Sequence, residues 1–299
     1  MKVSFIICYS STKAMTIFDN KSWPIQDTYH DESILAITKL LLEQISSIPI
    51  EKEILLMDNT GDFPTDWEVP DLRVIPSHGS WTKEELVNNS YIFENIKDDF
   101  EMYYPDGHFG EYPLELKWSN QAETTAMAYN HGLYMATGDY IVIQHNDTYY
   151  LSDGELIKDA IDLLESESYE YITVDKKPNK HEKYEKYEYF ADCYWFLCRG
   201  DFYKKHNIWV DWQRGDNNHL ATITCCDKGL KYLHLPGYFE NKEHDNFEYN
   251  KSYGYRTLFN LHTINENPFL IHIKGGTGLR KSKDIWETIH LINEGNLNE

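Results

Sequence analysis

The chain alternates between short, uninterrupted apolar runs and longer segments in which apolar residues recur every three or four positions. The apolar runs, which are too short for helices and predict buried strands, are residues 3–8, 53–57, 140–144 and 171–174. The segments with helical periodicity are residues 31–45, 120–136 and 155–164. Alternating strands and helices predict an α/β fold with a mostly parallel central sheet flanked by helices.

Weaker signals predict further elements. Strands are expected at residues 72–75, 194–198 and 232–235, and helices at residues 217–228 and 283–293. Residues 176–188 are mostly charged and predict a solvated loop, whereas the turn-rich residues 80–119 predict an insertion or a lid. Gly138 follows the helix of residues 120–136 at the position of a C-terminal cap.

Polar residues follow three of the predicted strands at the point where each strand ends. They are residues 9–11, 58–59 and 145–147. The carboxyl ends of parallel strands lie at one edge of a sheet, and ligands bind at that edge in open α/β folds. We therefore expect the functional site where these three segments converge.

Composition narrows the class of protein. The 299 residues include 49 Asp and Glu against 28 Lys and Arg, a net charge of −21, which argues against nucleic acid or an anionic membrane as a general partner. An anionic ligand would therefore need a local source of positive charge at its binding site. The aromatic share of 15% excludes intrinsic disorder. Five cysteines without metal-binding spacing, and no apolar stretch of membrane-spanning length, favour a cytoplasmic protein without a transmembrane segment.

Asp147 is the most informative of the strand-end residues. It follows the strand of residues 140–144, so its carboxylate lies at the rim of a rigid element. Mg²⁺ and Mn²⁺ prefer oxygen ligands and are commonly bound by one or two carboxylates together with substrate phosphates. The alternative is an aspartate that only forms the turn.

Residues 121–147 resemble the central part of a family 2 glycosyltransferase with the GT-A fold. The pattern has small residues on a helix, then a strand, then an acidic motif. The positions in register are Ala128, Asn130, Gly132, Ala136, Gly138, Tyr140, Ile141 and Asp147. More loosely, the resemblance extends to the first strand, to the strand that ends at Asp58 and to residues 190–236.

This resemblance implies a GT-A type single domain over residues 1–240, with a Rossmann-like nucleotide-binding half and the insertion or lid at about 80–119. Residues 241–299 would form a C-terminal extension that packs on the donor site. The implied donor is a nucleotide-diphosphate sugar.

The resemblance also assigns roles at the donor site. Asp58 would accept a hydrogen bond from the nucleotide base, and Tyr9 and Ser10 would line the base and ribose. Asp147 would bind the Mn²⁺ or Mg²⁺ ion that bridges to the donor diphosphate. The first acid of the family's D-x-D motif is His145 here and the middle residue is Asn146, which leaves His145 as a candidate metal ligand and Asn146 as a candidate donor contact.

A second group of candidates follows the strand of residues 268–273. His272 resembles the C-terminal histidine that completes the metal site in several GT-A enzymes. Lys274 and Arg280 belong to a Gly-rich, basic run whose backbone N–H groups could bind the diphosphate. A buried strand histidine followed by a flexible tail is the alternative.

The inverting mechanism of the family needs a general base for the acceptor hydroxyl. Asp216 is the nearest match, with Asp211 and Asp192 as rivals, and a helix N-cap is the alternative for Asp216. A last set of aromatic residues could stack on acceptor sugars or lie in the core: Tyr194, Trp195 and Trp212.

Together these features predict a metal-dependent, inverting glycosyltransferase that moves a sugar from a nucleotide-diphosphate-sugar donor to a hydroxyl of a glycan or glycan-lipid acceptor. Two alternatives remain. One is a catalytically inactive protein that binds a sugar or nucleotide sugar. The other is a sugar nucleotidyltransferase, although the Gly-rich loop those enzymes carry after the first strand is missing here. H-E-x-x-H and G-x-S-x-G motifs are also absent, which argues against a zinc or serine hydrolase.

Overall fold

A computed structural model shows the fold. It describes residues 1–10, 31–77, 88, 121–151, 155–174, 176–178, 187, 189–191, 194–210, 218–235, 259–265 and 267–273. The predicted insertion at 80–119 and the predicted helix at 283–293 lie outside these residues, apart from residue 88.

The centre of the protein is a seven-stranded sheet with the order β10-β6-β9-β4-β1-β2-β3. Its strands are β1 (Lys2–Tyr9), β2 (Glu51–Asp58), β3 (Leu72–Pro76), β4 (Tyr140–Gln144), β6 (Tyr171–Thr173), β9 (Trp195–Arg199) and β10 (Leu233–His234). Within it, β9 runs antiparallel to its neighbours β4 and β6, and the other pairings are parallel. The predicted mostly parallel α/β sheet is confirmed.

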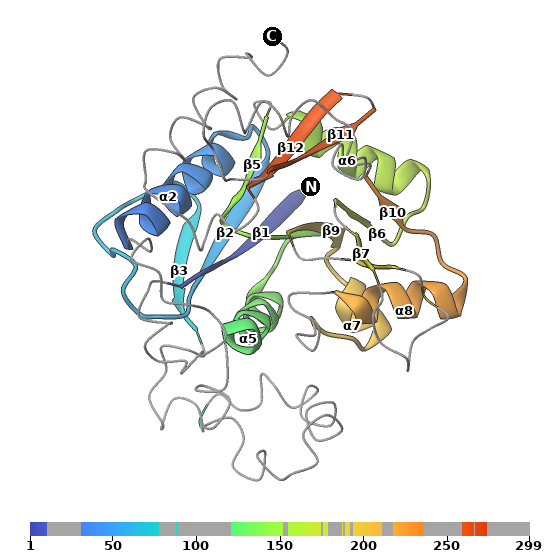
Figure 1. Ribbon diagram of the computed structural model, residues 1–299, viewed down its shortest axis with the longest axis horizontal. Coiled ribbons are helices and arrows are strands. Elements are labelled where there is room, and N and C mark those ends of the chain that lie inside the picture. The colour runs from blue at the N-terminus through green and yellow to red at the C-terminus, as the bar shows by residue number, and fades with distance from the viewer. Residues whose placement is uncertain are drawn as a thin grey trace.

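Helices cover both faces of this sheet. They are α2 (Asp31–Ser47), α5 (Gln121–Met135), α6 (Glu155–Ser166), α7 (Phe202–His206) and α8 (His219–Lys228). In Figure 1, α2 and α6 lie toward the top, and α5, α7 and α8 lie toward the bottom. Side chains of β1 alternate between the two layers: Phe5 and Ile7 pack with α2 and α6, whereas Ile6 and Cys8 pack with α5, α7 and α8. Burial on both faces explains why these strands are continuous apolar runs.

Two smaller sheets complete the described structure. β11 (Phe259–Ile264), β12 (Asn267–Ile273) and β5 (Thr148–Tyr150) form an antiparallel sheet in which β12 is central. This sheet brings a late segment of the chain beside the strand that follows β4 (Figure 1). Phe269, Leu270 and Ile271 of β12 belong to the same apolar core as α2 and α6.

The prediction of a solvated loop at residues 176–188 is wrong in part. β7 (Lys176–Pro178) pairs in antiparallel fashion with β8 (Tyr189–Ala191) to form a third, two-stranded sheet. Charged residues favour solvent, but a short strand satisfies its backbone groups through its partner regardless of side-chain polarity.

The predicted capping role of Gly138 is also wrong. Positive φ occurs at Gly61 and Gly229 among the described glycines, and Gly229 is the C-cap of α8. A Cβ at Gly138 would lie 2.6 Å from the backbone nitrogen of Ser4, and the Gly138 N–H donates to Ser4 Oγ at 2.8 Å. Gly138 is therefore required by the close approach of β1, not by its own dihedral angles.

The three strand ends named above do converge. β1 pairs in register with β2, Tyr9 opposite Asp58, and with β4, Ile7 opposite Gln144. The Asn59 N–H donates to the Tyr9 carbonyl at 2.9 Å, which extends the pairing past the ends of the strands. The polar residues after β1, β2 and β4 consequently lie at one edge of the sheet.

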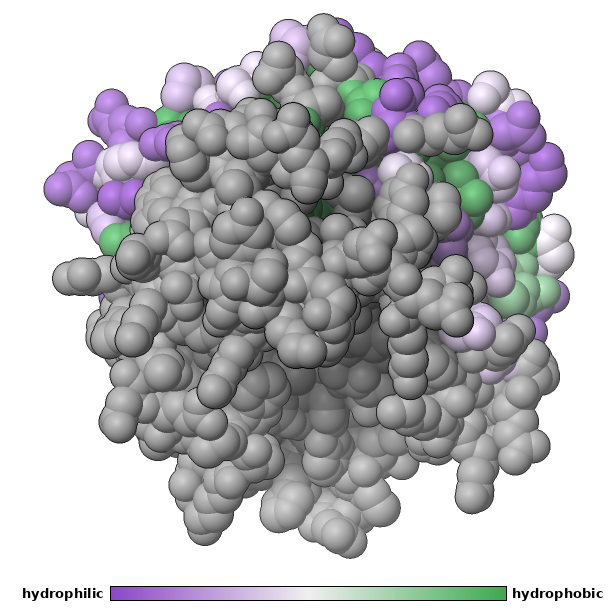
Figure 2. All heavy atoms as spheres, turned by 45° about the horizontal axis from the view of Figure 1, so that its top comes forward, coloured by the Kyte–Doolittle hydropathy of each residue, from purple (hydrophilic) through white to green (hydrophobic). Residues whose placement is uncertain are grey.

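The surface of the described residues is mainly hydrophilic in the view of Figure 2, with small apolar areas between the polar ones. The exposed large hydrophobic residues of the described segments are Met1 and Tyr134. Within the same segments, no helix is both long enough and apolar enough to cross a membrane.

Candidate metal and donor site

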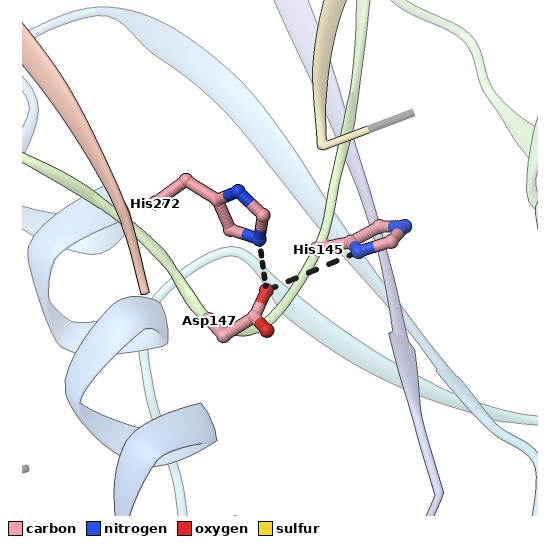
Figure 3. Close-up of side chains that lie close together, drawn as sticks. All are labelled: His145, Asp147 and His272. Atoms are coloured by element: carbon pink, nitrogen blue, oxygen red, sulfur yellow. Dashed lines mark ion pairs between the residues drawn. The ribbon is translucent and has the colours of Figure 1, made fainter. Parts of the chain in front are cut away.

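Three side chains from distant parts of the chain meet at the carboxyl edge of the sheet. His145 and Asp147 lie in the turn between β4 and β5, and His272 lies in β12 (Figure 3). Asp147 Oδ1 is 3.5 Å from His272 Nε2 and 3.9 Å from His145 Nδ1. One donor atom of each residue lies within 4.8 Å of the others, close enough for all three to bind a single ion. We call these residues the His-Asp-His cluster.

The cluster is almost inaccessible to solvent. Asp147 is 3% exposed and His272 is 1% exposed. Asp147 Oδ1 and His272 Nδ1 are buried atoms without a hydrogen-bond partner. A buried carboxylate oxygen in that situation loses its hydration without replacement, unless a cation binds it. The side chains present therefore fit a divalent ion.

The carboxyl group of Asp147 is ionised despite its burial. Burial by itself raises the pKa of a carboxyl group, but electrostatic attraction from the imidazole of His272, whose Nε2 lies 3.5 Å from Oδ1, and from that of His145 outweighs burial and holds the pKa of Asp147 below its ordinary value. A charged carboxylate is the form that binds a metal ion.

A buried chain of hydrogen bonds fixes the turn that carries His145 and Asp147. The Trp195 indole N–H donates to the Tyr150 hydroxyl at 3.0 Å, and that hydroxyl donates to Gln144 Oε1 at 2.6 Å. Gln144 Nε2 in turn donates to the Thr148 carbonyl at 2.7 Å, across the turn. Each of these polar groups has its partner, so the network stabilises one geometry of the turn.

The sequence-based hypotheses did not include Gln144 and Tyr150 in the site. The signal for Gln144 is a polar residue at the end of the otherwise apolar strand β4. No comparable signal marks Tyr150, because a tyrosine in a short strand is equally typical of an ordinary core.

Tyr194 packs against both histidines of the cluster. Its ring centroid is 3.7 Å from that of His272 and 4.8 Å from that of His145. The Tyr194 carbonyl also accepts the His145 N–H at 3.1 Å. Tyr194, a candidate for acceptor stacking, thus contacts the proposed metal ligands.

Trp195, the second acceptor candidate, is fully buried and packs edge-on against Phe269 at 5.0 Å. Its indole is enclosed by other side chains of the core, and stacking of Trp195 on an acceptor sugar stays a prediction. Its contribution to the site is the hydrogen bond to Tyr150.

Asp58 organises the loop that follows β2. Its Oδ1 accepts hydrogen bonds from the N–H groups of Thr60 at 3.1 Å and Gly61 at 2.8 Å, and its Oδ2 accepts one from Phe63 at 3.0 Å. Burial raises the pKa of Asp58 above its ordinary value even with these donors present. The carboxylate thus holds the loop at this edge of the sheet, and recognition of a base by Asp58 stays a prediction.

The other donor-site candidates surround the same edge. Tyr9 is 2% exposed and packs edge-on against Phe63 at 5.1 Å, and Ser10 follows it at the end of β1. The Asn146 amide donates to Thr38 Oγ1 of α2 at 3.0 Å and is 4% exposed, so it ties the turn to a helix. Donor binding by Tyr9, Ser10 and Asn146 stays a prediction.

The remaining candidates lie outside the described residues. They are the candidate bases Asp192, Asp211 and Asp216, the candidate acceptor residue Trp212, and the candidate diphosphate ligands Lys274 and Arg280. Their roles stay predictions.

Comparison with known proteins gives similar structures but no family. No protein-family model matches the sequence, and no curated protein matches it. Similar solved structures include a mannosyltransferase from Pyrobaculum calidifontis in complex with GDP-Man and Mn²⁺, with 12% identity and a TM-score of 0.41 over 78% of this chain and 54% of that one. They also include S. aureus TarS 1–349 in complex with UDP-GlcNAc, with 12% identity and a TM-score of 0.35 over 75% of this chain and 53% of that one.

A Drosophila galactosyltransferase in complex with manganese, UDP-Gal and xylobiose has 13% identity and a TM-score of 0.34, over 91% of this chain and 93% of that one. The protein spans about half the length of the first two structures. These are loose similarities of fold, and the chemistry of the site follows from its own residues.

Proposed function

We propose that the protein is a glycosyltransferase that uses a nucleotide-diphosphate-sugar donor and a divalent metal ion. The observation that carries the proposal is the His-Asp-His cluster at the carboxyl edge of a mostly parallel sheet, with an ionised and almost fully buried carboxylate at its centre. The GT-A sequence pattern of residues 121–147 ends at the same carboxylate.

The proposed reaction attaches the sugar to an acceptor hydroxyl of a glycan or glycan-lipid, with inversion. The acceptor oxygen forms a bond to the anomeric carbon while the bond from that carbon to the diphosphate oxygen breaks. The base, for which Asp216 is the candidate, takes the hydroxyl proton. A bound Mn²⁺ or Mg²⁺ ion would supply charge neutralisation for the leaving diphosphate.

The described residues have distinct tasks in this scheme. Asp147, His145 and His272 would bind the metal ion. Asp58 holds the 59–63 loop beside the donor edge through three backbone hydrogen bonds. The protein as a whole, with a net charge of −21, repels an anionic donor. A metal ion bound by the three side chains would supply the local positive charge that the donor needs. Its proposed location is the cytoplasm, on the strength of the cysteine pattern.

The proposal is tested with thermal melting in the presence of UDP-, GDP- and dTDP-sugars, with and without Mn²⁺, followed by an assay of donor hydrolysis. We expect one nucleotide class to raise the melting temperature in a metal-dependent way. The Asp147→Asn change should lower the hydrolysis rate about a hundredfold or more, since it removes roughly 3 kcal/mol of charge stabilisation. Asp162→Asn, the same change on the exposed face of α6, is the matched control and should be neutral.

Two results separate the alternatives. Stabilisation by a nucleotide sugar without any turnover would favour an inactive binding protein. Stabilisation by a nucleoside triphosphate together with a sugar phosphate would favour a nucleotidyltransferase. Failure of every nucleotide to bind would exclude the transferase proposal.

A further inference from the structure

The donor atoms of the His-Asp-His cluster differ in kind from those of a site built on two carboxylates. Two imidazole nitrogens, His145 Nδ1 and His272 Nε2, face one carboxylate oxygen, Asp147 Oδ1. We propose that this cluster discriminates among divalent ions, binding Mg²⁺ and Ca²⁺ more weakly than Mn²⁺, and Mn²⁺ more weakly than Co²⁺ and Zn²⁺. The inference rests on the proposed function only in taking the cluster as a metal centre.

Ligand chemistry is the first reason. Mg²⁺ and Ca²⁺ are hard cations that take oxygen ligands, whereas imidazole nitrogen suits later transition metals. For a given set of nitrogen and oxygen donors, affinity rises from Mn²⁺ through Co²⁺, and Zn²⁺ also binds more tightly than Mn²⁺. A centre with two nitrogens and one oxygen therefore offers Mg²⁺ one suitable protein ligand.

Burial is the second reason. Mg²⁺ loses its water reluctantly and usually keeps several water ligands when it binds to a protein. Asp147 and His272 are 3% and 1% exposed, and the side chain of His145 is 13% exposed. An ion that enters among these side chains exchanges water for protein ligands, which disfavours Mg²⁺ more than Mn²⁺, Co²⁺ or Zn²⁺.

Rigid support is the third reason. Tyr194 packs on both imidazoles, at 3.7 Å from His272 and 4.8 Å from His145. His272 lies in β12, the central strand of its sheet, and the hydrogen-bond chain through Gln144 fixes the turn of His145 and Asp147. This packing restricts rotation of both imidazole rings. The ring nitrogens therefore stay directed at the metal position, and water or another oxygen ligand cannot easily replace them.

The test uses the 299-residue protein, freed of metal with a chelator, and chloride salts of each ion without nucleotide. Titration calorimetry and thermal melting should give one binding site. The affinity should rise by roughly tenfold or more from Mg²⁺ to Co²⁺ and Zn²⁺, with Mn²⁺ between them. Binding should be lost in His272→Gln, whose folding is checked by circular dichroism and melting without metal.

The sharpest variant is His145→Asp, which replaces one nitrogen donor with a carboxylate. We expect it to raise Mg²⁺ affinity and to narrow the gap between Mg²⁺ and Co²⁺ by roughly tenfold. His206→Gln is the matched control, because His206 lies in α7, where it pairs with Glu170 at 3.3 Å. It should leave every affinity unchanged.

Three outcomes would overturn the inference: Mg²⁺ binding as tightly as Co²⁺ and Zn²⁺, absence of binding by all five ions, or binding that persists in His272→Gln. A fourth outcome separates the two proposals. If the ranking of ions holds but no nucleotide sugar binds in the presence of any ion, the metal selectivity stands and the transferase proposal fails.

Discussion

Asp147 and His131 are both buried ionisable side chains, and their surroundings leave one charged and the other neutral. Asp147 has two imidazoles as neighbours that offset its burial. His131, on α5, is 6% exposed, and burial lowers its pKa from 6.5 to about 4. At neutral pH the protein therefore contains an ionised carboxylate at the site and an uncharged imidazole in the core.

The pKa of His131 predicts a loss of stability in mild acid. Between pH 6.5 and about 4 the unfolded chain binds a proton at His131 that the folded protein does not. Stability therefore falls as the pH falls through this window, by up to about 3 kcal/mol for this group. Urea unfolding at pH 7, 6 and 5 should show a steeper decline for the natural protein than for His131→Gln.

Tyr134→Gln is the control for this measurement, since Tyr134 lies on the same helix and is 53% exposed. Its stability should decline with pH in parallel with the natural protein. A parallel decline of His131→Gln as well would show that other groups cause the acid sensitivity.

At the residue scale, the sequence named candidates for the site without showing which of them lie in the core. Asp147, His145 and His272 were identified as a metal set from the family resemblance, and the structure brings their donor atoms within 4.8 Å. Trp195 was expected either to stack on an acceptor sugar or to lie in the core, and the sequence left that choice open because aromatic residues occur in both settings. Its place follows from β12, which covers it through Phe269.

At the scale of elements, the packing of α5 against the sheet depends on a glycine, Gly132, which has no side chain at the contact. A Cβ at Gly132 would overlap the Cγ2 methyl of Ile6 in β1 and would lie 3.4 Å from Met57 Sδ in β2. Ile6 and Met57 are fully buried between strand and helix. Gly132 therefore sets how closely α5 approaches β1 and β2.

We expect Gly132→Ala to destabilise the protein by roughly 1–3 kcal/mol, although alanine is the better helix former by about 1 kcal/mol. Ile6→Leu removes the methyl that would be overlapped, so the double variant should be more stable than the two separate losses would predict. Urea unfolding of the four proteins in this cycle measures the coupling. Strict additivity would show that the overlap is relieved elsewhere.

Elements with strong periodicity were predictable, and elements defined by a distant partner were not. β4 occupies residues 140–144 as the apolar run predicts. The β7–β8 pair was missed because its first strand begins with Lys176 and Lys177, which favour solvent by themselves. β5 is only three residues long and exists through its pairing with β12, far along the chain.

At the scale of the whole molecule, the C-terminal strands are part of the main core. Ile264, Phe269, Leu270 and Ile271 are each at most 1% exposed and pack with the core beneath α2 and α6. Burial of four such side chains contributes roughly 6–12 kcal/mol, which is comparable to the whole stability of a typical domain.

A chain that ends at residue 258 should therefore fail to fold cooperatively, rather than fold without a metal site. Circular dichroism and urea unfolding would show this as a broad transition or none. Ile271→Ala in the full-length protein is the graded control and should cost about 2–5 kcal/mol while keeping a sharp transition. A truncated chain with a sharp transition would mean that residues 1–258 form an independent unit.

The pairing of β12 with β5 also sets an order of events during protein synthesis. His145 and Asp147 leave the ribosome well before His272 does. When they emerge, β12, which carries His272, has not yet folded. A nascent chain that has been translated only through β10 holds an incomplete donor set. The His-Asp-His cluster can close only after residue 272 has emerged and β12 has docked, so a complete cluster marks a chain whose synthesis has passed its last described strand.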